Sequence, residues 1–135
     1  MAKTYSLFIS HSWDHDDTLQ SLKNLLNSRG YFPALYTQVE KDCPINSENA
    51  AVIKANITKR LKDSDVLLAI AGVFASHSDW MQWEMDKAKE LGLNVIGVIP
   101  WGQQHISVEV CSRSVVDVRW NVDSIVDAIR EYSKQ

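Results

Sequence analysis

The sequence predicts an α/β fold in which helices cover both faces of a five-stranded parallel sheet. Short apolar segments alternate with segments of helical periodicity along the chain, and two of the apolar segments are almost free of polar residues. Strict alternation favours parallel strands joined by helical crossovers. A strand that is apolar throughout is typical of one buried on both faces of a parallel sheet. We expect a single domain over residues 1–135, because this length suits one core.

The first quarter of the chain predicts a strand, a helix and a second strand. Residues 5–9 form a short apolar segment typical of a strand. Four leucines then recur at helical spacing, namely Leu19, Leu22, Leu25 and Leu26. Gly30 ends this helix, and residues 32–37 form the next strand. Pro33 indicates that this strand lies at an edge of the sheet, because proline cannot donate a ladder hydrogen bond.

The next segment predicts a long loop, a helix and a doubly buried strand. Residues 38–48 form a connection that is long for a compact domain, and such loops are often functional. Ile53, Ile57 and Leu61 mark one face of the following helix. The apolar run at 65–71 predicts a strand that is buried on both faces.

The remaining elements repeat the alternation. We expect a helix at 78–91 ended by Gly92, a doubly buried strand at 94–99, and a short last strand at 115–118 preceded only by a loop. Asn121 is then the N-cap of a final helix.

The order of these elements predicts where a ligand binds. Right-handed crossovers and five alternating strands favour the flavodoxin-like doubly wound order 2-1-3-4-5. In this order the switch point lies between the first and third strands, and ligands bind at the carboxyl ends of such strands. The loops at 10–17 and 72–80 lie there.

Composition excludes several classes of partner. The net charge is −3, which differs from the basic character of nucleic-acid-binding domains. The apolar runs are much shorter than a membrane span. Residues 1–4 lack the apolar region of a signal peptide. We therefore expect a cytoplasmic protein without nucleic-acid or membrane partners.

The residues near the switch point favour a site built around one carboxylate. The loop after the first strand has no glycine, which argues against a flavin or dinucleotide site. The third strand does not end in an aspartate, which argues against a phosphoacceptor domain. Trp80 and Glu84 lie one turn apart on one helix face. A carboxylate beside an indole is partly desolvated, which strengthens its interaction with a developing cation.

Two motifs resemble those of a known family. Phe8-Ile-Ser-His-Ser12 is similar to the opening strand and loop of TIR domains, and Trp80-Met-Gln-Trp-Glu84 is similar to their W-x-x-x-E helix. The resemblance is closest to the TIR-like family that includes the ThsB proteins of Thoeris antiphage systems. Segments at 64–68, 98–102 and 119–126 support it, so it covers nearly the whole chain.

The resemblance implies an enzyme that breaks the nicotinamide–ribose bond of NAD, of the NAD nucleosidase or ADP-ribosyl cyclase type. Glu84 matches the glutamate that is catalytic in the enzymatic members. Members similar to this chain make a cyclised or conjugated ADP-ribose, which activates a separate effector in antiphage defence. NAD is then the substrate, and no cofactor or metal is expected.

Further site residues follow from the same resemblance. Phe8, Ser10 and His11 are expected to contact the nicotinamide riboside or its phosphates. The loop around Asp42 is a candidate lid that excludes water, which would favour cyclisation or transfer over hydrolysis. Trp80 is expected to stack on the substrate or to shape the pocket.

Two other functions stay open on the sequence. TIR domains associate with one another, so the chain is expected to self-associate, and a non-catalytic interaction module is one alternative. The other alternative is an enzyme similar to nucleoside deoxyribosyltransferases, which also use one glutamate on a flavodoxin-like sheet.

Overall fold

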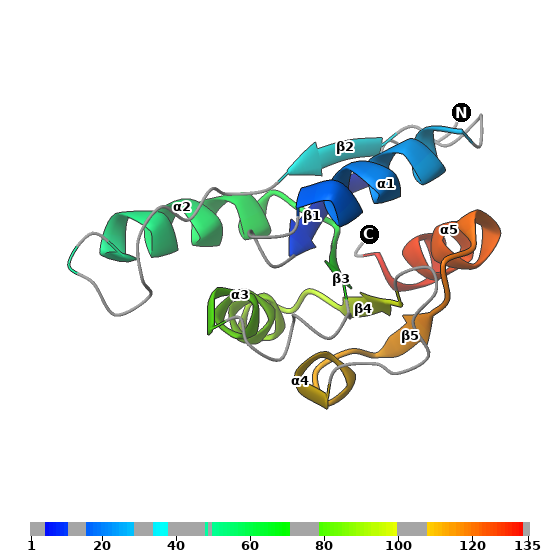
Figure 1. Cartoon of the computed structure of the whole chain (residues 1–135). Coiled ribbons are helices and arrows are strands. Elements are labelled where there is room, and N and C mark those ends of the chain that lie inside the picture. The colour runs from blue at the N-terminus through cyan, green and yellow to red at the C-terminus, as the bar shows by residue number, and fades with distance from the viewer. Residues whose placement is uncertain are drawn as a thin grey trace.

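The computed structural model describes residues 5–10, 16–28, 34–37, 48, 50–70, 79–99 and 108–133. Strands and helices alternate along these residues (Figure 1). The strands are β1 (Tyr5–Ser10), β2 (Ala34–Thr37), β3 (Val66–Ile70), β4 (Val95–Val98) and β5 (Val116–Val118). The helices are α1 (Asp16–Asn27), α2 (Ala50–Lys62), α3 (Asp79–Glu90), α4 (Val108–Cys111) and α5 (Val122–Tyr132).

The five strands form one parallel sheet in the order β2-β1-β3-β4-β5. This confirms the predicted fold class and the predicted strand order. β2 lies at an edge of the sheet, as predicted, although Pro33 itself lies outside the described residues. The central strand β3 pairs with both β1 and β4, and all five of its side chains are buried. The switch point therefore lies between β1 and β3.

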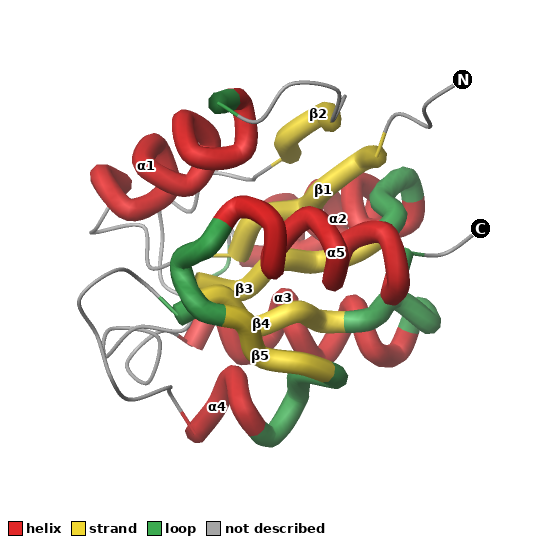
Figure 2. The backbone as a smooth tube through the Cα atoms, turned by 90° about the vertical axis from the view of Figure 1, so that its right-hand side faces the viewer, coloured by secondary structure: helices red, strands yellow, loops and turns green. Residues whose placement is uncertain are grey.

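Helices lie on both faces of the sheet (Figure 2), and each face has its own apolar core. We call these the α2–α3 cluster, on the face covered by α2 and α3, and the α1–α5 cluster, on the opposite face. Successive side chains of a strand point to opposite faces. Phe8 and Leu67 therefore belong to the α2–α3 cluster, whereas Leu7 and Leu68 belong to the α1–α5 cluster. Burial of each such side chain stabilises the fold by about 1.5–3 kcal/mol.

Two helix ends form as the sequence predicted. Gly92 follows α3 with φ of 83°, a left-handed conformation that glycine adopts without a steric penalty. The side chain of Asn121 accepts a hydrogen bond of 3.0 Å from the backbone N–H of Ser124 at the start of α5. These residues fix the end of α3 and the beginning of α5.

The structure corrects the expectation of only a loop between the last two strands, because α4 lies there. Four residues are too few to give a helical periodicity, so the sequence pattern did not reveal it. Val110 on this helix is fully buried in the α2–α3 cluster.

The structure also places Asp65 before β3, where its Oδ2 accepts a hydrogen bond of 2.9 Å from the backbone N–H of Ser6.

Some predictions lie outside the described residues. Gly30 is one of them. Of the predicted loop at 38–48, only Glu48 is described. Of the two loops at the switch point, the structure describes only Ser10 and residues 16, 17, 79 and 80. In the part of the chain that is described, every helix is too short or too polar to cross a membrane.

Candidate functional site

Glu84 lies on the buried face of α3. The buried residues of this helix recur at helical spacing: Trp80, Met81, Glu84, Met85 and Ala88. Met81, Met85 and Ala88 form the apolar stripe that the periodicity predicts. Glu84 has a relative exposure of 0%. A glutamate in such a stripe is unusual, since glutamate is almost never fully buried unless it has a partner.

A partner of Glu84 is the last residue of β1. Ser10 is also fully buried, and its hydroxyl donates a hydrogen bond of 2.8 Å to Glu84 Oε1. The side chain of Ser10 points to the same face of the sheet as that of Phe8, because the two residues are two apart on a strand. The hydrogen bond therefore joins the carboxyl end of β1 to the face of α3 that packs on the sheet.

The Ser10–Glu84 pair lies at the topological switch point. Ser10 is in register with Ala69 near the end of β3. β1 and β3 are neighbours in the sheet, and their crossovers pass over opposite faces. Ligands of doubly wound sheets bind outside the carboxyl ends of such strands. The structure thus brings a carboxylate to the position where the topology favours a ligand.

Among the side chains that the structure describes, Glu84 is the one that is both ionisable and buried. The buried polar or charged residues there are Ser10, Ser64 and Glu84. Ser64 precedes β3, and its hydroxyl donates to the carbonyl of Arg60 at 2.8 Å. Strands β1, β3 and β4 contain no charged residue. The carboxylate therefore lies in an apolar region, where its interactions with charge are stronger than in water.

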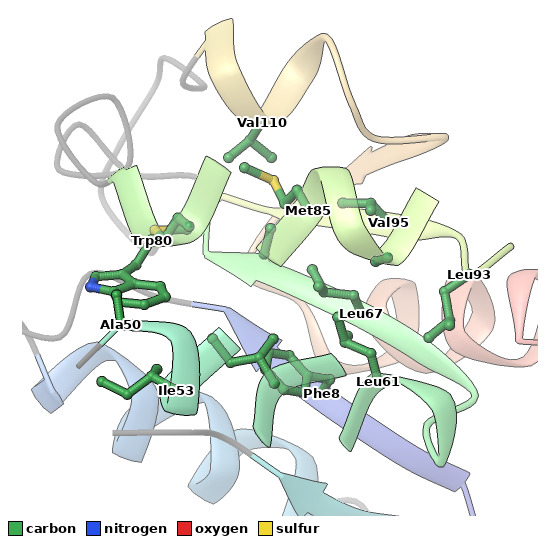
Figure 3. Packing of buried hydrophobic residues seen from close by; sticks show 14 residues of the cluster. Phe8, Ala50, Ile53, Leu61, Leu67, Trp80, Met85, Leu93, Val95 and Val110 are labelled. Carbon is green, nitrogen blue, oxygen red and sulfur yellow. The ribbon is translucent and has the colours of Figure 1, made fainter. Parts of the chain in front are cut away.

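Trp80 and Trp83 form an aromatic group next to Glu84. Their ring centroids lie 6.4 Å apart with an interplanar angle of 76°, which is an edge-to-face contact. Trp80 is 5% exposed and belongs, with Ala50 of α2, to the α2–α3 cluster (Figure 3). Lys54 and Lys87 place their ammonium groups 5.8 and 5.5 Å from the centroid of Trp83. Trp80 is thus held between α2 and α3.

The predicted site residues fall into three groups. The structure brings Ser10 and Glu84 into contact, and it places Trp80 one turn from Glu84 on α3. Phe8 is fully buried in the α2–α3 cluster, so it packs in the core in this structure. His11 and Asp42 lie outside the described residues. The roles of all these residues toward a substrate stay predictions.

The contact between Ser10 and Glu84 was not predicted. The two residues are 74 positions apart in the sequence. Two features of the sequence indicate such a contact. Ser10 lies two residues after Phe8 and so faces the same side of the sheet, and Glu84 is a polar residue within the apolar stripe of α3. A search for polar residues at core positions of two predicted elements would have found the pair.

The site can place the negative charge of Glu84 next to a positive charge that develops on a bound substrate. A carboxylate with a fixed hydrogen-bond donor in an apolar region needs little reorganisation when a cation forms beside it. Across the described ranges, no group of three or more His, Cys, Asp or Glu side chains gathers in a way that could hold a metal ion.

Known proteins match the chain in sequence pattern and in fold. Residues 8–105 match the family described as Thoeris protein ThsB, TIR-like domain. No curated protein matches the chain in sequence. A 2-deoxyribosyltransferase from Bacillus psychrosaccharolyticus is similar in structure with a TM-score of 0.62 and 13% identity, over 90% of each chain.

A second solved structure with this fold is a CMP N-glycosidase from Clostridium botulinum. Its TM-score is 0.53 at 13% identity, and the match covers 93% of this chain and 98% of that chain. At such low identity the two structures show a shared fold, and they do not assign an activity to this chain.

Proposed function

Since the matched residues make up more than half of it, the chain belongs to the family of Thoeris ThsB TIR-like domains, and on this premise we propose that it breaks the nicotinamide–ribose bond of NAD. The product is an ADP-ribose derivative, cyclised or conjugated, that acts as a signal in antiphage defence. The observation that supports this proposal most is the buried carboxylate of Glu84 at the switch point.

The chemistry of NAD suits a site with one carboxylate. When the bond between ribose C1′ and the pyridinium nitrogen breaks, its electron pair goes to the nitrogen and nicotinamide leaves as a neutral molecule. No general acid is needed. The ribosyl group becomes oxocarbenium-like. The carboxylate of Glu84 stabilises this charge more than it stabilises the ground state, and this difference is what accelerates the reaction.

The second half of the reaction decides the product. The oxocarbenium carbon accepts an electron pair from a nucleophile, and a hydroxyl nucleophile then loses its proton. Water gives ADP-ribose, whereas a group of the same nucleotide or of a second molecule gives a cyclic or conjugated product. A site that excludes water favours the second course. The apolar surroundings of Glu84 agree with such a site.

The burial of Glu84 predicts that the reaction includes an opening step. The side chain is 0% exposed, so a substrate reaches it only when the groups that cover it move. Such steps limit the turnover of many enzymes. We therefore propose that activity rises when a trigger or self-association favours the open form.

The test is nicotinamide release from NAD by the full chain, followed by chromatography and mass spectrometry of the products. Glu84→Gln keeps the size of the side chain and removes its charge. We expect it to lower the rate at least about 100-fold, as loss of one electrostatic group typically does. Glu90→Gln is the matched control, because Glu90 lies on the same helix with its side chain 67% exposed. It is expected to keep the activity of the wild type.

A deoxyribosyltransferase activity is the second candidate, and the fold of the Bacillus enzyme favours it. The same variants are incubated with a deoxynucleoside and a free base. Exchange of the base with NAD left intact decides for this candidate. If the wild type processes neither substrate at high protein concentration, with infected-cell lysate added as a source of the trigger, and instead forms a large, partner-dependent assembly, the chain is a non-catalytic interaction module.

A further inference from the structure

The geometry points to Ser10 as a positioning residue that keeps the carboxylate of Glu84 ionised and fixed in orientation. This inference rests on the proposed function, because it assigns to Ser10 a role in the same site. Sequence similarity suggested that Ser10 contacts the substrate directly. In the structure its hydroxyl donates to Glu84 Oε1 at 2.8 Å, with both side chains fully buried.

The burial of Glu84 creates a need for such a donor. Removal of a carboxylate from water disfavours the charged form, and a neutral glutamic acid cannot stabilise an oxocarbenium-like cation. A hydroxyl that donates to the carboxylate favours the charged form instead. Hydrogen bonds to an ionised acceptor are about twice as strong as neutral ones. Ser10 therefore opposes the effect of burial.

Other described charges lie toward the surface. Strands β1, β3 and β4, on which α3 packs, contain no charged side chain. On α2 and α3, Lys54 and Lys87 are half-buried and lie over Trp83. The remaining charged residues of these helices are exposed, namely Lys59, Arg60, Lys62, Asp79, Asp86, Lys89 and Glu90. After α4, Arg113 forms an ion pair with Asp86. Solvent screens exposed charges more than buried ones.

The position of Ser10 explains how it fixes an orientation. It is the last residue of β1, and its backbone is held in register with Ala69 of β3. The side chain of serine has one rotatable bond before the hydroxyl oxygen, so the oxygen has few positions. A donor on a rigid strand holds an acceptor more tightly than a donor on a loop.

The experiment is an NMR titration of the Glu84 side-chain carboxyl in the full chain labelled with ¹³C-glutamate. The signal is assigned by its loss in Glu84→Gln. We expect Ser10→Ala to raise the pKa of Glu84 by about one unit, a tenfold change in the ionisation constant. Ser10→Thr retains the hydroxyl and is expected to restore the pKa. If Ser10→Ala does not fold, Ser10→Cys, a weaker donor of similar size, gives the same comparison.

Ser64→Ala is the matched control for a general effect of removing a buried hydroxyl. Ser64 is 1% exposed, and its hydrogen bond is also 2.8 Å long, but its acceptor is the carbonyl of Arg60. The inference is overturned if Ser10→Ala leaves the titration of Glu84 unchanged, or if Ser64→Ala shifts it equally.

The titration needs no turnover, so it separates this inference from the proposed function. If the pKa of Glu84 shifts and nicotinamide is not released, only the proposed function fails. If nicotinamide is released, the acid limb of kcat/KM is expected to move to higher pH in Ser10→Ala by the same amount as the titration, with KM nearly unchanged. A fall in activity without this displacement contradicts the role of Ser10.

Discussion

Gly97 in β4 lies where two neighbouring side chains approach the backbone. It is in register with Asp117 of β5. A Cβ atom at position 97 would overlap Asp117 Oδ1 and would lie 3.1 Å from a methyl group of Val110. Asp117 Oδ1 also accepts a hydrogen bond of 2.5 Å from the hydroxyl of Ser114, which limits its movement. Glycine thus lets α4 and β5 pack closely on β4.

Gly97→Ala is expected to lower the free energy of unfolding by about 1–3 kcal/mol, the usual cost of overpacking. Urea denaturation of the folded chain measures this change. Because Asp117 causes the main overlap, the variant with both Gly97→Ala and Asp117→Ala should lose less stability than the sum of the two single variants. Strict additivity would mean that the overlap with Asp117 is not the cause.

Single residues also show how far the sequence predicted the candidate site. Glu84 was found from its spacing to Trp80 on one helix, which is local information. Its contact with Ser10 depends on how α3 packs against β1, and no local pattern contains that distance. Phe8 packs in the core, because position 8 shares its face with α2 and α3, and its predicted contact with substrate stays a prediction.

At the scale of elements, Tyr36 joins the edge strand β2 to α1. Its hydroxyl donates to Asn27 Oδ1 at 3.2 Å, and Lys23 lies 5.9 Å from its ring centroid. Burial raises the pKa of Tyr36 above its usual value of 10.0. The ionised form is thus less favourable in the folded chain than in the unfolded chain.

The pKa of Tyr36 predicts how stability depends on alkaline pH. Below about pH 10 the side chain is protonated in both states, and its full contribution to stability is present. As the pH rises through the raised folded pKa, the unfolded chain binds fewer protons than the folded chain, so stability is lost. Urea denaturation above pH 10 is expected to show a steeper fall for the wild type than for Tyr36→Phe. Equal slopes would contradict this assignment.

The elements also differ in how well the sequence predicted them. β3 and β4 were predicted almost to the residue, because strands buried on both faces are apolar throughout. α3 was predicted because its apolar stripe spans three turns and Gly92 ends it. α4 was missed, since it has one turn and forms through the tertiary contact of Val110 with the core.

At the scale of the whole molecule, the sheet separates two apolar cores that share β3. Leu67 points into the α2–α3 cluster, which contains Trp80 and surrounds the candidate site. Leu68 points into the α1–α5 cluster on the other face. Both side chains are fully buried. Since both cores need β3 in place, the loss of one is expected to remove the other.

Leu67→Ala and Leu68→Ala are therefore expected to destabilise the chain to a similar extent, by about 2–5 kcal/mol. Amide hydrogen exchange under native conditions tests whether the two cores unfold together. Each variant is expected to speed exchange equally in α3 and in α5, because the most protected amides exchange through global unfolding. If Leu68→Ala speeds exchange in α5 and leaves α3 protected, the two cores unfold separately. In that case the core around Glu84 would keep its structure while the opposite face opens, and the candidate site would be independent of α1 and α5.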